Sequence, residues 1–134
     1  MKEDPKVTVY VVDDEPNIAA TLTAILSQSG FHAIGFTDSN NALASAQFQA
    51  PELLITDVFL PGMNGIELAI RFKSEFPGCK ILLISGHGAT SDLLESAAKQ
   101  EHRFDCLAKP IHPAYILAAI QNVITDGVAE TWAN

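Results

Sequence analysis

The sequence predicts a doubly wound α/β domain, in which helices cover both faces of a five-stranded parallel sheet. Apolar runs of strand length alternate five times with segments of helical period, the order that βα units produce. The first run, Val7–Val12, is continuous and β-branched, as expected for a strand buried on both faces. A chain of 134 residues with 48% hydrophobic and 18% charged residues can supply the core of one such domain.

The first two units are read from helix start signals and apolar stripes. Pro16 opens the first helix at a position where its missing N–H costs no hydrogen bond. The inward stripe of this helix consists of Ile18, Leu22, Ile25 and Leu26. The second strand covers Ala33–Phe36, and the helix after it is capped at Asp38 or Ser39. Its inward residues are Leu43 and Ala46.

The third and fourth units follow the same pattern. Leu53–Ile55 is the third strand, and the turn Pro61–Gly65 leads into a helix. The apolar side of that helix consists of Leu68, Ala69, Phe72 and Phe76. The fourth strand is Ile81–Ile84, and the helix at Ser91–Gln100 is expected to bury Leu93, Leu94, Ala97 and Ala98.

The fifth unit completes the domain. Phe104–Ala108 is the last strand, and the last helix runs from His112 to Asp126 before Gly127. Its apolar stripe consists of Ile116, Ala119, Ile120, Val123 and Ile124. We therefore expect one domain over residues 7–126, flanked by tails at 1–6 and 127–134.

Composition limits the classes of partner. The formal net charge is −8, from 8 Lys+Arg against 16 Asp+Glu, so the chain repels polyanions and direct nucleic-acid binding is not expected. No run approaches the roughly 20 apolar residues of a membrane span. Cys79 and Cys106 lie in apolar runs, which favours free thiols in a reducing compartment. We expect a cytoplasmic protein without membrane contact.

Polar residues follow four of the predicted strands. Asp13 and Asp14 come after the first, Asp57 after the third, Ser85 after the fourth and Lys109 after the fifth. Because the carboxyl ends of parallel strands meet at one edge of the sheet, these side chains are expected to share a crevice. Each residue alone has an ordinary explanation, such as a helix cap for the two acids of the first turn, so the hypothesis rests on the whole set.

This set suits phosphoryl transfer. Mg²⁺ is commonly bound by one or two carboxylates together with a phosphate, which matches Asp13, Asp14 and Asp57. Lys109 suits a phosphoryl oxygen, and Ser85 can donate a hydrogen bond to another. Asp57 would then be the nucleophile and would form an acyl phosphate.

Four segments resemble motifs of the receiver domain of two-component response regulators. Residues 9–16 resemble its acidic opening and residues 57–65 its phosphoacceptor loop. Residues 84–86 and 107–110 resemble its hydroxyl and lysine segments. The resemblance covers nearly the whole chain, from Val7 to Ile124.

The resemblance implies a flavodoxin-like strand order of 2-1-3-4-5 and a cis Lys109–Pro110 peptide bond. It implies that the chain catalyses its own Mg²⁺-dependent phosphorylation and dephosphorylation without being a conventional turnover enzyme. The phosphodonor would be a histidine kinase or a histidine phosphotransfer protein, and the output an unknown downstream protein. The carbonyl of Phe59 would complete the metal site, and Ser85 would move on activation. Formation of a homodimer is left as an open alternative.

Two departures from the family pattern keep an alternative open. Cys106 stands where the family usually has the Tyr or Phe that changes orientation on activation, and His102-Arg103 replaces a frequent Gly-Ala pair. The alternative is a phosphorylation-independent interaction module with a receiver fold. A phosphatase or a nucleotide-binding protein fits less well, because the chain has neither a compact Asp-x-Asp motif nor a Gly-rich loop after the first strand.

Overall fold

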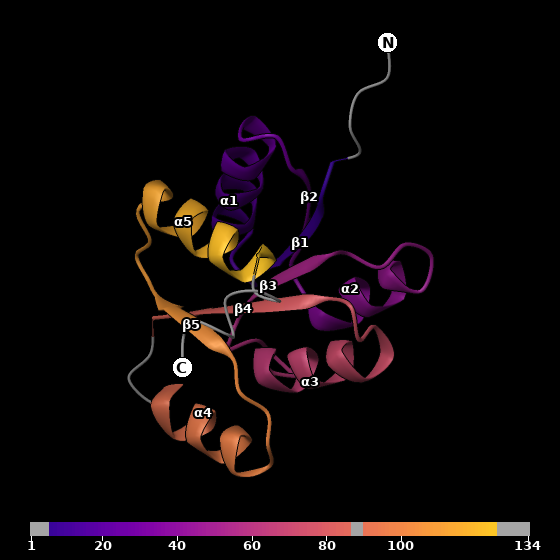
Figure 1. The fold of residues 1–134 in the computed structure, drawn as a ribbon, viewed down its shortest axis with the longest axis vertical. Helices are drawn as coiled ribbons and strands as arrows, with labels where there is room; N and C mark the ends of the chain where they lie inside the picture. The colour runs from indigo at the N-terminus through magenta and orange to yellow at the C-terminus, as the bar shows by residue number, and fades with distance from the viewer. Residues whose placement is uncertain (1–5, 87–89, 126–134) are drawn as a thin grey trace.

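The computed structural model describes residues 6–86 and 90–125, which form five strands and five helices in alternation (Figure 1). The strands are β1 (Thr8–Val12), β2 (His32–Phe36), β3 (Leu53–Asp57), β4 (Lys80–Ser85) and β5 (Asp105–Ala108). The helices are α1 (Pro16–Gln28), α2 (Ser39–Ala46), α3 (Gly65–Glu75), α4 (Thr90–Lys99) and α5 (Pro113–Ile124). The predicted helix end at Gly127 and the predicted tails, apart from Lys6, lie outside the described residues.

The sheet has the order β2-β1-β3-β4-β5, and every neighbouring pair is parallel. The doubly wound fold and its strand order are therefore confirmed. The order reverses direction at β1, so β1 and β3 lie side by side at the centre of the sheet. In sheets of this kind, ligands bind beyond the carboxyl ends of the strands at that switch point.

Two apolar layers hold the helices against the sheet. One layer joins residues of β1, β3 and β4 such as Val11, Ile55 and Ile84 to Leu26 of α1 and Ile116 of α5. The other joins alternate residues of the same strands to α2, α3 and α4. Figure 1 shows this division, with α1 and α5 on one face and the other three helices on the opposite face. The alternation follows from the two-residue period of a strand.

Helix α4 is less buried than the sequence predicts. Ala97 is buried as expected, but Leu93, Leu94 and Ala98 are only half-buried, so that part of the prediction is wrong. The reason lies in its packing, because α4 lies beside α3 at the end of the sheet that the edge strand β5 forms (Figure 1). β5 also begins at Asp105, so the expected first strand residue, Phe104, precedes the strand and is half-buried.

Helix caps explain several boundaries. Asp38 caps α2 by accepting a hydrogen bond from the backbone N–H of Asn41, one of the two caps predicted. Asn64 and Glu67 form a reciprocal capping box at the start of α3. The N-cap of α1 is Glu15, so neither of the preceding aspartates caps that helix.

Among the residues that the structure describes, none belongs to a helix both long and apolar enough to cross a bilayer.

Candidate functional site

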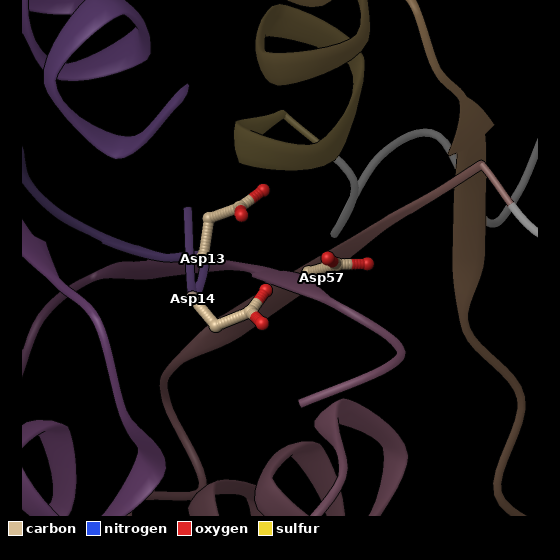
Figure 2. A group of neighbouring side chains, drawn as sticks. All are labelled: Asp13, Asp14 and Asp57. Carbon is tan, nitrogen blue, oxygen red and sulfur yellow. The ribbon is translucent and has the colours of Figure 1, made fainter. Parts of the chain in front are cut away.

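Three carboxylates meet beyond the ends of the two central strands. Asp13 and Asp14 directly follow β1, and Asp57 is the last residue of the neighbouring β3. Each of the three offers an oxygen, and these oxygens lie within 4.8 Å of one another. Figure 2 shows the three side chains at the same edge of the sheet. Asp13 and Asp57 are buried and Asp14 is exposed, so the cluster opens to solvent on one side.

The position of Asp57 depends on a close approach of two backbone segments. The N–H of Gly65, the first residue of α3, donates a hydrogen bond of 2.7 Å to the carbonyl oxygen of Val58. A Cβ atom at Gly65 would collide with the carbonyl oxygen of Asp57. Glycine is thus required where the helix passes over the end of β3. From the sequence, Gly65 is predicted only as part of a turn, because this contact between backbones depends on the fold.

Both carboxylate oxygens of Asp13 are engaged. Oδ1 accepts a hydrogen bond of 2.9 Å from the backbone N–H of Glu15, and Oδ2 accepts one of 2.7 Å from Lys109. These bonds compensate for the full burial of a charged group. The carboxylate is thereby fixed in orientation at the base of the site.

Lys109, the residue after the edge strand β5, bridges two of the acids. Its Nζ lies 2.7 Å from Asp13 and 3.1 Å from Asp57, and its backbone N–H donates to the carbonyl oxygen of Ser85. Burial alone would lower the pKa of Lys109, but the hydrogen bonds to the two aspartates outweigh that effect and hold the pKa above its ordinary value. The ammonium is therefore charged at neutral pH.

The net charge of the site suits a divalent cation. Three carboxylates carry −3 and the lysine +1, which sums to −2 for Asp13, Asp14, Asp57 and Lys109. A hard cation such as Mg²⁺ takes oxygen ligands and would cancel this charge. The donor set fits such an ion, and the exposed side of Asp14 leaves space for the waters that Mg²⁺ retains.

The remaining predicted site residues lie around this cluster. Ser85 is buried at the end of β4, next to β3 in the sheet. Phe59 is half-buried, and its backbone N–H lies 3.4 Å from Oδ1 of Asp57. Cys106 is half-buried in β5; burial and, in smaller part, the negative charge of Asp57 raise the pKa of its thiol. The Lys109–Pro110 bond is cis, as the resemblance implied.

An apolar groove runs beside Lys109 between α1 and the segment that joins β5 to α5. Its volume is about 550 Å³, and the residues that line it are Asn17, Ile18, Thr21, Leu22, Ile25, Ile84, Lys109, Pro110, Ile111 and Pro113. The groove is not predicted from the sequence, because the apolar residues of α1 all fit its inward stripe. The helical period identifies an apolar side, but not how much of it a neighbouring helix covers.

Comparison with known proteins decides the family. The sequence model of the response regulator receiver domain matches residues 9–121. This chain belongs to that family. It is therefore a receiver domain of two-component signalling, and the predicted family is confirmed.

Individual relatives agree with this receiver domain over most of its length. The nitrogen assimilation regulatory protein NtrX of Azorhizobium caulinodans is 32% identical over 125 residues, which are 92% of this chain and 26% of that protein. The DNA-binding response regulator MtrA of Mycolicibacterium smegmatis is 32% identical over 116 residues, 84% of this chain and 48% of that protein. The crystal structure of the NtrX receiver domain from Brucella abortus is similar with a TM-score of 0.77 at 28% identity, covering 87% of this chain and 98% of that one.

The chain thus spans about a quarter of one of these regulatory proteins and about half of the other. What it shares with them is the receiver part.

Proposed function

We propose that this receiver domain accepts a phosphoryl group on Asp57 and acts as a conformational signalling switch. The observation that supports the proposal is the cluster of Asp13, Asp14 and Asp57 within 4.8 Å, bridged by Lys109. Mg²⁺ would be held by the three aspartates and the backbone carbonyl of Phe59. When bound, the ion supplies positive charge that stabilises the oxygens of the transferring phosphoryl group.

The chain's own residues set up an in-line displacement. A carboxylate oxygen of Asp57 attacks the phosphorus of a phosphohistidine, forming a P–O bond while the P–N bond breaks. The donor protein's imidazole is the leaving group; its nitrogen keeps the bonding electron pair, and the unmodified histidine side chain is regenerated. Lys109 holds a positive charge 3.1 Å from Asp57, where negative charge builds up on the phosphoryl oxygens. The donor would be a histidine kinase or a histidine phosphotransfer protein.

The switch would start from the charges already paired in the site. A phosphoryl group on Asp57 competes with the carboxylate of Asp13 for the ammonium of Lys109. The backbone of Lys109 is hydrogen-bonded to Ser85, so a shift of the lysine reaches the ends of β4 and β5 together. Ser85 donates to a phosphoryl oxygen, and Cys106 repacks in place of an aromatic side chain. Output passes to a downstream protein through this side of the domain.

The primary test is labelling with acetyl phosphate and Mg²⁺, read by intact mass. One phosphoryl adduct is expected for the wild type, none for Asp57→Asn, and an unchanged amount for Asp92→Asn, which alters an exposed aspartate of α4. Chelation of Mg²⁺ is expected to abolish labelling. An adduct that persists in Asp57→Asn would contradict the assignment of the phosphoacceptor.

The groove beside α1 suits the docking of the phosphodonor protein, because it is apolar and adjoins Lys109. Thr21 is an exposed residue of its lining, so Thr21→Arg would place a large charge there without disturbing the core. Transfer from a phosphorylated histidine phosphotransfer protein is expected to slow at least tenfold, while labelling by acetyl phosphate stays normal. Equal slowing of both reactions would instead place the damage in the site itself.

A phosphorylation-independent interaction module is the second candidate, and Cys106 is the observation that favours it. A small thiol at this place cannot repeat the reorientation of a large ring. The affinity of a binding partner for the chain with and without Mg²⁺ and beryllofluoride separates the two functions. A switch predicts a change in affinity, whereas a constitutive module predicts none.

A further inference from the structure

A cavity rich in cations lies at the opposite edge of the sheet from Asp57. Its volume is about 330 Å³, and it is lined by Lys73, Lys80, Ile81, Arg103, Phe104, Asp105 and Val123. Lys80 is the first residue of β4, and Ser85, beside the phosphoacceptor, is the last. Five steps of a parallel strand place these two ends roughly 16 Å apart. The cavity is therefore separate from the site described above.

Among the described residues, none of the three cations of this cavity forms an ion pair. The ion pairs within residues 6–86 and 90–125 are made by Arg71 and Lys109, and no carboxylate lies within 4.0 Å of Lys73, Lys80 or Arg103. The Nζ of Lys73 donates a hydrogen bond of 3.2 Å to the carbonyl oxygen of Cys79, which fixes its position at the cavity. One acid, Asp105, shares the lining, so the net charge is +3 − 1 = +2.

This concentration of positive charge is unusual within the chain. The whole sequence has 8 Lys+Arg and a net charge of −8, and three of those cations line this one cavity. Cations placed together repel one another and destabilise the fold slightly. Arg103 is also half of the His102-Arg103 pair that departs from the family pattern.

We propose that this cavity binds a small phosphate monoester that carries hydroxyl groups, such as a sugar phosphate. The guanidinium of Arg103 can bind two phosphate oxygens at once, and the two ammonium groups supply point charges. Asp105 would repel a bare phosphate but accepts hydrogen bonds from ligand hydroxyls. The volume matches the lower end of small-molecule sites, and the concave shape suits a compact ligand better than a segment of protein.

The test is an NMR titration of the full chain with ribose 5-phosphate, using inorganic phosphate and ribose as reference ligands. Omitting Mg²⁺ and holding ionic strength constant with chloride keeps the acidic site from competing. We expect shifts of the backbone amides of Lys80, Phe104 and Asp105, and none at Asp13 or Asp57. Ribose 5-phosphate should bind more tightly than either reference ligand.

Four variants, each replacing one charged side chain by an uncharged polar one, test the assignment of roles. Lys80→Gln and Arg103→Gln are each expected to weaken binding about tenfold, the effect of losing a hydrogen bond to a charged group. Lys99→Gln is the matched control, since Lys99 is an exposed cation of α4 outside the cavity lining, and it should bind like the wild type. Asp105→Asn should increase the affinity for inorganic phosphate. The ratio between the affinities for ribose 5-phosphate and inorganic phosphate should therefore fall.

Several results would overturn the proposal. Shifts centred on the aspartates of the opposite edge would assign the anion to that site, and equal weakening by Lys99→Gln would reduce the effect to overall charge. Binding to Arg103→Gln at wild-type affinity would show that the guanidinium of Arg103 does not bind the phosphate, which contradicts the proposal. Saturation by an acidic peptide without competition from ribose 5-phosphate would make the surface a protein contact.

Discussion

Each buried side-chain nitrogen or oxygen in the described part of the chain has a hydrogen-bond partner. The effect of a buried polar residue on stability therefore depends on its hydrogen-bond partner as well. Asp13 is held by Glu15 and Lys109 in the acidic site, and Tyr10 is held in the layer beneath α2. Such networks fix one arrangement of the core, because leaving a buried partner unpaired costs more than the bond itself contributes. Substitutions at these pairs should change stability by measurable amounts.

Tyr10 provides the first prediction. Its ring is 1% exposed and its hydroxyl donates to the carbonyl oxygen of Gln49 at 2.7 Å, with Ser45 Oγ at 2.9 Å. Tyr10→Phe keeps the ring but leaves the Gln49 carbonyl without this donor. We expect a loss of roughly 1–2 kcal/mol in the free energy of unfolding, measured with urea. Tyr115→Phe, at a residue 71% exposed, is the control and should change it little.

Cys79 provides a pH-dependent prediction. Burial raises the pKa of its thiol to about 12. The unfolded chain has a thiol pKa near 8.5, so above that pH the unfolded state releases a proton that the folded state retains. The stabilising contribution is therefore complete below about pH 8.5 and is lost as the pH rises toward 12.

Urea unfolding of the wild type and Cys79→Ala measures this effect, since Cys106 is common to both. The difference in unfolding free energy between them should shrink by roughly 2 kcal/mol between pH 8.5 and pH 10. A difference that stays constant with pH would mean that the thiol ionises equally easily in the folded state.

The elements were predicted more completely than their ends. Continuous apolar runs and helical stripes located all five strands and helices, because burial leaves a periodic pattern in the sequence. Asp57 and Ser85 were expected after their strands but are the last residues of β3 and β4, since ladder hydrogen bonds do not require an apolar side chain. The burial of α4 was overestimated, because a stripe on a helix does not reveal how much of it the neighbouring elements cover.

The candidate site was predictable to a similar degree. Parallel topology brought the acids and Lys109 together as expected, since every strand ends at the same edge. Contacts made by the backbone were not predictable. The approach of Gly65 to the Asp57 carbonyl and the bond from Lys109 to the Ser85 carbonyl depend on atoms that all residues share.

The junction between β3 and α3 gives a prediction at this scale. Gly65→Ala would place a methyl group against the Asp57 carbonyl and force the start of α3 away from the strand. We expect a loss of roughly 1–3 kcal/mol in unfolding free energy and slower labelling of Asp57 by acetyl phosphate. Gly78→Ala is the matched control, because a Cβ there meets nothing within 4 Å. Normal stability in Gly65→Ala would show that the helix can shift freely.

The whole molecule carries its charge unevenly. The net charge is −8, and a share of −2 is concentrated in the buried and half-open acidic cluster. Repulsion among its carboxylates is partly relieved by the ammonium of Lys109. The stability of the domain should therefore depend on divalent cations far more than on monovalent salt.

Thermal unfolding with Mg²⁺ and with a chelator measures this dependence. At a Mg²⁺ concentration of about a hundred times the Kd, the gain is about 2.7 kcal/mol, which corresponds to a rise in Tm of roughly 5–10 °C. Asp14→Asn should remove most of the rise and increase stability in the chelator, because it lowers the repulsion. Glu95→Gln, at an exposed acid of α4, should keep the full response. A rise of the same size in both variants would indicate general screening.

The cavity lined by Lys73, Lys80 and Arg103 and the acidic cluster lie at opposite ends of the strands. Positive charge gathers where β4 and β5 begin, and negative charge gathers where β1 and β3 end. The strands run from the positive pole at the cavity to the negative pole at the acidic cluster, so the two clusters form an electric dipole along the sheet. An approaching cation is turned toward one pole and an anion toward the other before either touches a side chain.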